Sequence, residues 1–331
     1  MTLSPDLPTF ADVEDAARRL AGKAVVTPLI EHPALNERVG GRVLLKPEVL
    51  QLSGSFKFRG AYNRISRFSE DERRRGVVAY SSGNHAQGVA AAARMVGTPA
   101  VIVMPSDAPA VKIAGVKAFG GEVRLYDRVK ESREAIGAEI AAQRGSVLVP
   151  PFDDFHVIAG QGAVGLELAR QAEALGAELD LVCCGASGGG VIAGIGLALE
   201  ALTPRTKLLV VEPELYDDHA RSLAAGERTT HAPAPYSICD SLMAPLPGEL
   251  TWPLNRRKLS GAVTVSDAEV EEAMRFAFST LKLVVEPGGA VSLAALLAGK
   301  VEAAGRTVGV VLTGGNVDPA YFGRVIAGGR H

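Results

Sequence analysis

The chain has 331 residues, a formal net charge of −2 and a pI near 6.3. A chain of this length exceeds what one ordinary hydrophobic core supports, so two domains are predicted. The nearly neutral charge, without a basic run, excludes an electrostatic footprint for nucleic acid and favours a small-molecule partner.

Cysteine use and hydropathy indicate a reduced, non-membrane setting. The three cysteines, Cys183, Cys184 and Cys239, are too few for a disulfide framework and lack metal-ligand spacing. The stretch from Leu181 to Leu199 carries no charge, but six glycines interrupt it, which suits a strand, a loop and a buried helix better than a membrane span. The acidic N-terminal region is unlike a secretory signal, so the expected location is the cytoplasm.

Short β-branched runs alternate with alanine-rich helical segments along the chain. The first set predicts strands at 76–80, 100–104 and 122–126, with helices at 85–96 and 112–119 between them. The second set predicts strands at 181–184, 207–211 and 307–312, with one helix after Gly190 and another over 267–281. This βαβ alternation predicts two doubly wound units with parallel strands.

A lysine at position 57 lies in the segment SGSFKFRGA, Ser53 to Ala61, among small and aromatic residues. A lysine amine attacks a carbonyl only when it is neutral, and a desolvated setting lowers its pKa toward that state. The alternative is an ordinary solvated lysine, which the motif alone favours because most lysines are surface groups. The choice therefore depends on other segments.

A glycine-rich run, CGASGGG, ends at Gly190 between a predicted strand and a predicted helix. Its backbone N–H groups and the helix dipole favour a phosphate there. The same run loosely fits a dinucleotide fingerprint through Gly188, Gly190 and Ala193, with Glu212 as the ribose-binding acid. A dinucleotide-binding oxidoreductase is thus the rival hypothesis, although it leaves Lys57 without a role.

Two polar turns follow other predicted strands. The SSGNH turn, 81–85, predicts either a carboxylate-binding turn or an ordinary helix cap. The TGGN turn, 313–316, places a hydroxyl where it can face the edge of a ring, unless it is a simple left-handed turn. Together, an amine, a phosphate site and polar ring-edge partners match the needs of pyridoxal phosphate.

The motifs also occur in a recognisable order. SGSFKFRGA, SSGNH, the SGGG loop, VEPGG at 285–289 and LTGGNVD at 312–318 resemble, as a set, the fold type II pyridoxal-phosphate enzymes, especially threonine and serine dehydratases and serine racemase. The resemblance covers nearly the whole chain. It implies an α/β protein with two doubly wound domains of tryptophan-synthase-β-like architecture and the cofactor in the cleft between them. Residues 1–76 and 152–331 would form the large cofactor-binding domain and 77–151 the small domain, in a homodimer.

The resemblance assigns roles to individual residues. Lys57 becomes the Schiff-base lysine and catalytic base, and Ser82 matches the residue that protonates the opposite face in serine racemase. Residues expected to hold the cofactor are Phe56, Lys57, Asn84, Ser187, Gly188, Gly189, Gly190, Glu286 and Thr313. Residues expected to bind the substrate are Ser81, Ser82, Gly83, Asn84, His85 and Arg133. A threonine hydroxyl facing the pyridine nitrogen leaves the ring a weaker electron sink, which suits β-elimination.

A metal is implied by the segment from Glu212 to Asp218. It matches the family segment in which two acids and a backbone carbonyl bind a hard cation, here Glu212, the Tyr216 carbonyl and Asp218. Oxygen ligands of this kind suit Mg²⁺, or Ca²⁺ or Mn²⁺, rather than Zn²⁺. The alternative is an acidic surface turn.

The predicted function is that of an ammonia-lyase that converts a β-hydroxy amino acid, L-threonine or L-serine first, to a 2-keto acid and ammonia. Serine racemase and dehydratases of 3-hydroxyaspartate or phenylserine are alternatives, and a silent binding protein with the same fold is a third class. Arg133 falls where serine racemase has a substrate-contacting arginine, so it can bind a β-carboxylate unless it is a solvated helix residue. Ser187 in place of the usual first glycine, and the segment from Cys239 to Ala244 in place of an ADG-type segment, predict an altered pocket.

Overall fold

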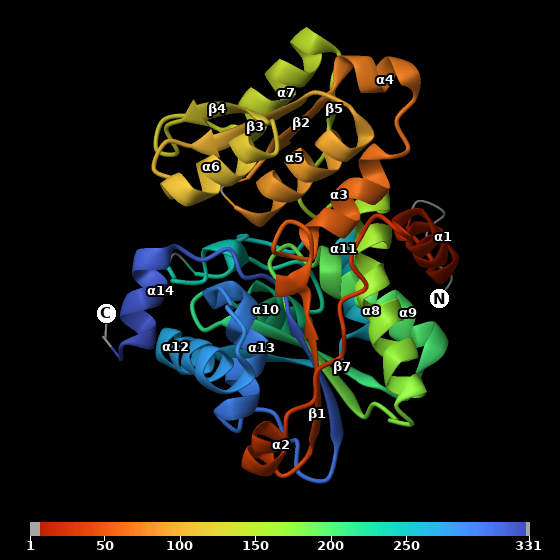
Figure 1. The fold of residues 1–331 in the computed structure, drawn as a ribbon, viewed down its shortest axis with the longest axis vertical. Helices are drawn as coiled ribbons and strands as arrows, with labels where there is room; N and C mark the ends of the chain where they lie inside the picture. Colours follow the sequence, from red (N-terminus) through yellow and green to blue (C-terminus); the bar gives the residue numbers. More distant parts are fainter. Residues whose placement is uncertain (1–6, 82, 233, 329–331) are drawn as a thin grey trace.

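Two parallel sheets organise the protein (Figure 1). The computed structural model describes residues 7–81, 83–232 and 234–328. The larger sheet has the strand order β1-β9-β6-β7-β8, the smaller has β4-β3-β2-β5, and all neighbouring strands in both are parallel. The strands are β1 (Arg42–Pro47), β2 (Val77–Tyr80), β3 (Ala100–Pro105), β4 (Glu122–Tyr126), β5 (Val147–Leu148), β6 (Leu181–Gly185), β7 (Lys207–Pro213), β8 (Gly261–Val265) and β9 (Thr307–Leu312).

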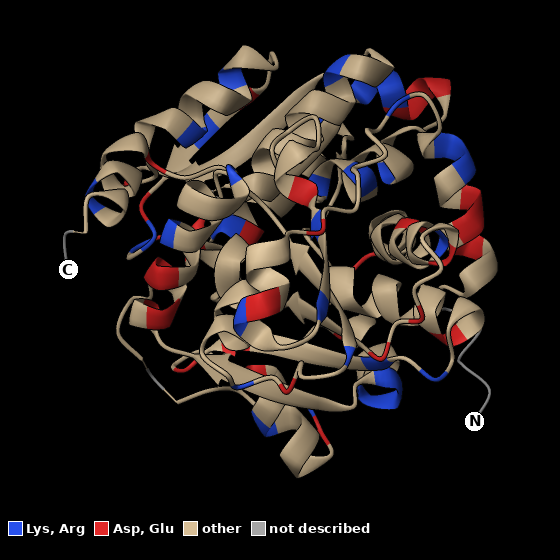
Figure 2. Ribbon diagram, turned by 60° about the horizontal axis from the view of Figure 1, so that its bottom comes forward, with Lys and Arg blue, Asp and Glu red and all other residues tan. Residues whose placement is uncertain are grey.

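Helices surround the sheets and carry most of the charged residues. Figure 2 shows basic and acidic residues interspersed along these helices. No helix in the described ranges is long and apolar enough to cross a membrane. The helices are α1 (Phe10–Leu20), α2 (Pro33–Val39), η1 (Glu48–Leu50), α3 (Lys57–Ile65), α4 (Glu70–Arg75), α5 (Asn84–Val96), α6 (Ala110–Ala118), α7 (Arg133–Arg144), α8 (Phe155–Ala174), α9 (Gly190–Leu202), α10 (Asp218–Ala225), η2 (Asp240–Leu242), α11 (Thr251–Lys258), α12 (Asp267–Phe276), η3 (Ala277–Leu281), α13 (Pro287–Leu297) and α14 (Pro319–Ile326).

The predicted α/β class with parallel strands is confirmed, and β4 and β9 have the predicted bounds. The single helix predicted over 267–281 is instead α12 followed by the π-helical turn η3. The sequence predicted no strand at β1, β5 or β8. In β1, the fully buried Lys46 interrupts the apolar run that marks a buried strand.

Helix α3 lies where the two sheets meet (Figure 1). Its buried Phe58 and Ala61 pack with Ile102 and other residues of the smaller sheet. Phe56, just before α3, packs with Leu44 of the larger sheet. The strands of the smaller sheet all fall within 77–151, while the exact domain boundaries stay a prediction.

The polar turns of the sequence lie at carboxyl ends of strands. Residues 186–189 follow β6, Thr313 follows β9, and Ser81 follows β2. Because neighbouring parallel strands end at the same edge, β6 and β9 bring their turns together. This edge faces α3 and contains the candidate site.

Candidate active site

Lys57 is the first residue of α3, and its amine is enclosed. Its Nζ donates a hydrogen bond to the Pro151 carbonyl at 2.6 Å and lies 5.1 Å from the centre of the Phe56 ring. Among the described residues it has no ion-pair partner, and desolvation lowers the pKa of the amine to about 7. A large fraction of the amine is therefore neutral at physiological pH, as a nucleophile or base requires.

One cavity, the Lys57 cavity, brings most of the predicted site residues together. Its lining includes Phe56, Lys57, Ser81, Gly83, Asn84, His85, Arg133, Ser187, Gly188, Gly189, Gly190 and Thr313. Ser82 lies outside the described residues. Glu286 lines an adjoining cavity instead, and is joined to the Lys57 cavity through Asn84.

The glycine turn, residues Ser187–Gly190, leads into the N-terminus of α9 on the wall of this cavity. Its carbonyl oxygens are bound from behind: Thr251 Oγ1 donates to the Gly188 carbonyl at 2.6 Å, and Asn255 Nδ2 donates to the Gly189 carbonyl at 3.2 Å. Backbone N–H groups at a helix N-terminus favour an anion in front of them. The turn therefore suits a phosphate.

Close packing explains why this turn needs glycine. A Cβ on Gly188 would lie 2.2 Å from the Phe152 ring, and one on Gly189, whose φ is +90°, would lie 2.3 Å from Asn255 Nδ2. Thr251 and Asn255, both buried on α11, were missed by the sequence reading. Their polar types are ordinary for a helix, and only the fold brings them to the turn.

Asn84 is fixed at the cavity by two partners. Its amide nitrogen donates to Glu286 Oε1, and its oxygen accepts from Asn316 Nδ2 at 2.8 Å. Burial raises the pKa of Glu286 to about 7, and its Oε2 has no hydrogen-bond partner in the described part of the chain. Thr313 Oγ1 donates to the Gly288 carbonyl at 3.4 Å, and its own carbonyl accepts the Phe56 N–H at 3.2 Å. The residue before Lys57 is thus tied to the end of β9.

His85 is a neutral part of the cavity wall. Its Nε2 bonds the Val149 carbonyl at 2.9 Å, and burial, with the nearby Lys57 amine, lowers the pKa of the imidazole to about 3. Its Nδ1 is buried without a hydrogen-bond partner in the described ranges. The predicted contact of His85 with substrate stays a prediction.

The described lining of the cavity includes three cationic side chains, the partly neutral amine of Lys57 and one carboxylate; the cations are Lys112, Arg128 and Arg133, and the carboxylate is Asp240. The Arg133 guanidinium lies over the Tyr80 ring, 5.5 Å from its centre, and pairs with the exposed Glu134. Lys112 is 5% exposed and forms an ion pair with Asp240. Burial opposes its charge, but Asp240 and Glu286 outweigh this and raise the pKa of Lys112. The sequence reading missed both members of this pair, although Asp240 belongs to the segment that departs from the ADG type.

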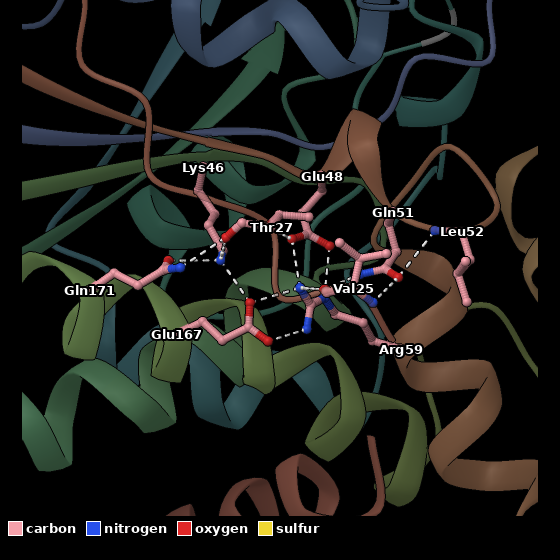
Figure 3. A network of polar contacts seen from close by, with 9 residues as sticks. All are labelled: Val25, Thr27, Lys46, Glu48, Gln51, Leu52, Arg59, Glu167 and Gln171. Atoms are coloured by element: carbon pink, nitrogen blue, oxygen red, sulfur yellow. Dashed lines mark hydrogen bonds and ion pairs between the residues drawn. The ribbon is translucent and has the colours of Figure 1, made fainter. Parts of the chain in front are cut away.

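A buried network of ion pairs anchors α3 through Arg59 (Figure 3). Arg59 donates to Glu48 at 2.7 Å and to Glu167 at 2.6 Å, and Lys46 donates to Glu167 at 2.7 Å. The side chains of Lys46, Glu48 and Arg59 have no exposed surface, while that of Glu167 is 14% exposed. Two cations and two carboxylates thus neutralise one another between β1, η1, α3 and α8.

The predicted metal ligands form a second, buried cluster. Glu212 and Asp218 have no exposed surface, and their carboxylates lie near the imidazole of His219, which the sequence reading missed. Glu212 accepts the backbone N–H groups of His219 at 2.8 Å and Ala220 at 2.9 Å. Asp218 Oδ2 lies 3.5 Å from His219 Nδ1, within ion-pair distance, but neither oxygen of Asp218 accepts a hydrogen bond within the described residues. Burial raises the pKa of Asp218 to about 6, and Asp218 and Glu212 together raise the pKa of His219 to about 9. Two buried carboxylate oxygens that accept no hydrogen bond also suit a metal cation.

The dinucleotide hypothesis conflicts with this placement. A ribose-binding acid must reach the ligand, but Glu212 is fully buried and does not line the Lys57 cavity.

Tyr216, the residue whose carbonyl is the third predicted metal ligand, is also buried, and its hydroxyl donates to the Pro235 carbonyl at 3.1 Å.

The residues of the Lys57 cavity fit pyridoxal phosphate. A desolvated amine can bind its aldehyde, the glycine turn at the start of α9 can bind its phosphate, and Asn84 and Thr313 offer polar groups to its ring. None of these features alone is specific for pyridoxal phosphate, but their occurrence together in one cavity is.

Comparisons with known proteins agree with this fit. The family described as "Pyridoxal-phosphate dependent enzyme" matches residues 21–314. An L-threo-3-hydroxyaspartate ammonia-lyase from Pseudomonas sp is 44% identical, over 97% of this chain and 99% of the relative. A threonine deaminase structure from the organism abbreviated T.th. has a TM-score of 0.88 at 42% identity, covering 94% of this chain and 99% of that one. Maize serine racemase has a TM-score of 0.90 at 36% identity, covering 97% of each chain. The chain therefore belongs to the family of pyridoxal-phosphate dependent enzymes.

Proposed function

We propose that the protein is an ammonia-lyase that acts on a β-hydroxy amino acid carrying a second carboxylate, of the 3-hydroxyaspartate type. The observation that carries this proposal is the charge of the Lys57 cavity, where three cationic side chains, Lys112, Arg128 and Arg133, and the partly neutral amine of Lys57 face one carboxylate among the described lining residues. A doubly negative substrate gains more from such a lining than serine or threonine does. The similarity to the Pseudomonas ammonia-lyase supports the same choice.

The reaction removes a proton from Cα and hydroxide from Cβ, which leaves an enamine; the enamine tautomerises to an imine, and water hydrolyses the imine to a 2-keto acid and ammonia. Bound pyridoxal phosphate supplies the electron-withdrawing ring that makes the Cα proton acidic. Its phosphate would bind at the glycine turn, with Phe56, Asn84, Glu286 and Thr313 around its ring. Lys57 takes the Cα proton, because its desolvated amine is neutral and basic near pH 7.

Two groups of residues would hold the substrate. The turn around Ser81, Gly83 and Asn84 binds the α-carboxylate at the N-terminus of α5, and the neutral His85 closes the wall beside it. Arg133 binds the second carboxylate, because its guanidinium lines the cavity and its carboxylate partner, Glu134, is exposed to solvent. Ser82 remains the proposed residue on the opposite face, which a racemase would use.

L-Threonine or L-serine is the second candidate. Asp240 neutralises Lys112, and Arg128 pairs with Asp107 at 2.8 Å, so part of the positive charge is already balanced within the protein. A cavity balanced in this way accepts an uncharged side chain. This is the substrate choice that the sequence motifs favour.

The test compares kcat/KM for L-threo-3-hydroxyaspartate, L-threonine and L-serine, measured by release of keto acid. We expect the dicarboxylate to be preferred, and Arg133→Leu to lower its kcat/KM by at least about tenfold while that for serine changes little. Arg144→Leu, at the other end of α7 and outside the cavity, is the matched control. A wild-type preference for serine or threonine would reject the dicarboxylate in favour of the second candidate.

We also propose a divalent cation, Mg²⁺, Ca²⁺ or Mn²⁺, at Glu212, Asp218 and the Tyr216 carbonyl. The two buried oxygens of Asp218, neither of which accepts a hydrogen bond within the described residues, support it. A chelator should lower the melting temperature of the wild type and leave that of Glu212→Gln unchanged. An unchanged wild-type melting temperature would count against the cation.

We further propose that the protein is a homodimer and is located in the cytoplasm. The three cysteines are buried free thiols, as a reducing compartment favours. Light scattering of the purified protein checks the oligomeric state, and a mass near that of a single chain would reject the dimer.

A further inference from the structure

We propose that Tyr80 is a positioning residue whose ring holds the Arg133 guanidinium in the Lys57 cavity and thereby determines selectivity for a substrate with a second carboxylate. The inference rests on the proposed function, in which Arg133 binds that carboxylate. It adds the group that keeps the guanidinium in place before the substrate arrives.

Arg133 is the cation of the described cavity lining that is best able to bind a carboxylate. Lys112 is already paired with Asp240, and Arg128 contacts Asp107 through both Nε, at 2.9 Å, and Nη2, at 2.8 Å. Arg133 forms its ion pair through Nε alone, and its two terminal nitrogens have no hydrogen-bond partner within the described residues. These two nitrogens can donate side by side to one carboxylate.

The surroundings of Arg133 on its own helix do not fix its position. Its side chain is 42% exposed, and Glu134, which pairs with its Nε, is 55% exposed. An exposed ion pair restrains an arginine only weakly, and ordering a long side chain when a ligand binds costs affinity. Arg133 is also the first residue of α7, where the helix dipole disfavours a cation. Its place is therefore not explained by the stability of α7.

Tyr80 provides a rigid surface against the guanidinium. The guanidinium carbon of Arg133 lies 5.5 Å from the centre of the Tyr80 ring, which is within the range of a cation–π contact, and both residues line the Lys57 cavity. The ring packs on the core of the smaller sheet around Val78 and Val103. A Cβ on Gly137 would lie 3.2 Å from Tyr80 Cδ1, so the backbone of α7 also passes close to the ring. A ring held in this way restrains the arginine.

The position of Tyr80 in the chain connects the two proposed carboxylate sites. Tyr80 is the last residue of β2, and Ser81 begins the turn proposed to bind the α-carboxylate. One strand end thus supports the first carboxylate directly and the second through Arg133. A site whose parts are fixed in advance binds its ligand at a smaller cost in ordering.

Substrate selectivity and ligand affinity of the cofactor-loaded protein test the proposal. Tyr80→Leu should lower the ratio of kcat/KM for L-threo-3-hydroxyaspartate to that for L-serine by about fivefold. The loss should appear in KM rather than in kcat, because the ring supports a group that binds the substrate before and during the reaction. Titration calorimetry should show a similar rise in the Kd for succinate, a dicarboxylate that has no amine and does not react.

Two further variants isolate the role of the ring. The Tyr80 hydroxyl has no hydrogen-bond partner within the described residues, so direct donation to the substrate is the competing explanation. Tyr80→Phe keeps the ring and should keep the wild-type ratio. Phe68→Leu removes a ring that lies 5.5 Å from the Arg64 guanidinium carbon, outside the cavity, and is the matched control. Tyr80→Met is a second variant without a ring if Tyr80→Leu does not fold.

A double-mutant cycle with Arg133→Leu tests whether Tyr80 acts through the arginine. Once Arg133 is absent, Tyr80→Leu should have no further effect on the Kd for succinate. An equal effect of Tyr80→Leu with and without Arg133 would overturn the positioning role, and so would a Tyr80→Phe variant that loses as much affinity as Tyr80→Leu.

The outcomes also separate this inference from the proposed function. Unchanged succinate binding in Tyr80→Leu, with weakened binding in Arg133→Leu, would overturn the role of Tyr80 alone. Unchanged binding in Arg133→Leu would overturn the role of Arg133 and this inference together. If the wild type prefers L-serine as substrate, the proposed function fails, and the succinate cycle still decides whether Tyr80 holds Arg133.

Discussion

Lys57 shows how the fold changes the chemistry of a single side chain. Desolvation lowers the pKa of its amine from an ordinary value of 10.5 to about 7, and no carboxylate in the described ranges pairs with it to oppose this shift. A lysine that kept its ordinary pKa would be almost entirely protonated in the cell, and a protonated amine is neither a nucleophile nor a base.

The first prediction concerns the pH dependence of cofactor attachment. The amine is neutral above its pKa, so covalent attachment of pyridoxal phosphate to the apo-protein should accelerate as pH rises and reach half its maximum near pH 7. Borohydride trapping followed by peptide mass spectrometry, between about pH 6 and pH 10, measures the profile and locates the modified residue.

Two variants serve as controls for this profile. Lys57→Ala should show no attachment, while Lys117→Ala, at an exposed lysine of α6, should match the wild type. A half-maximum near pH 10 would show that the amine is solvated, which contradicts the desolvated site.

The sequence could identify those site residues that belong to local motifs. Lys57, Asn84 and Thr313 each stand in a glycine-containing turn or segment, and the structure brings all three to one cavity. His219 and Asn255 belong to helices with no distinctive pattern. Their importance depends on packing between distant segments, which spacing along the chain does not encode.

At the scale of elements, α3 is held by charges rather than by an apolar face alone. Arg59 has no exposed surface and contacts Glu48 and Glu167, from η1 and α8. Such a network costs desolvation energy, but it leaves few alternative positions for the helix that begins with Lys57. The network thereby fixes the start of α3 relative to β1.

The second prediction removes one member of this network. Arg59→Met leaves the carboxylate of Glu48 buried without its guanidinium, so the free energy of unfolding should fall by about 3 to 5 kcal/mol. Arg306→Met, which breaks an exposed pair with Glu302, should change it by less than about 1 kcal/mol. Urea denaturation of the apo-proteins measures both.

A compensating variant tests the stated cause. Adding Glu48→Leu to Arg59→Met removes the uncompensated carboxylate and leaves Lys46 paired with Glu167. Most of the lost stability should return. If it does not, the loss arises from altered packing of α3 and not from the buried charge.

Element boundaries could be predicted where the pattern is regular. The strand at 307–312, TVGVVL, is rich in β-branched residues, the strand at 122–126, EVRLY, follows a Gly-Gly pair directly, and the structure confirms the bounds of both. The segment predicted as one helix over 267–281 is helical up to Leu281, but its last part, Ala277–Leu281, is a π-helical turn that ends before Lys282, whose φ is +60°. The sequence pattern does not indicate where a residue other than glycine adopts a left-handed backbone conformation.

At the scale of the whole molecule, the two sheets approach each other across the Lys57 cavity. Lys112 comes from α6, beside the smaller sheet, and Asp240 from η2, whose Leu242 packs in the core of the larger sheet, so their ion pair joins the two parts of the fold. The same pair lines the cavity, so it also sets the charge that a substrate meets. Neither residue stands in a recognisable motif, because the pair exists only after both parts have folded and met.

The third prediction follows from the two roles of the Lys112–Asp240 pair, which joins the two parts of the fold and lines the cavity. Asp240→Asn removes the one carboxylate of the described cavity lining and leaves the charge of Lys112 unbalanced, so a second carboxylate on the substrate meets a stronger positive potential. The ratio of kcat/KM for L-threo-3-hydroxyaspartate to that for L-serine should rise by about fivefold, which corresponds to roughly 1 kcal/mol, and the gain should shrink at high salt. Glu302→Gln, at an exposed pair outside the cavity, is the control and should leave the ratio unchanged. If kcat/KM instead falls equally for both substrates, the pair acts by holding the two parts of the fold together and does not select the substrate.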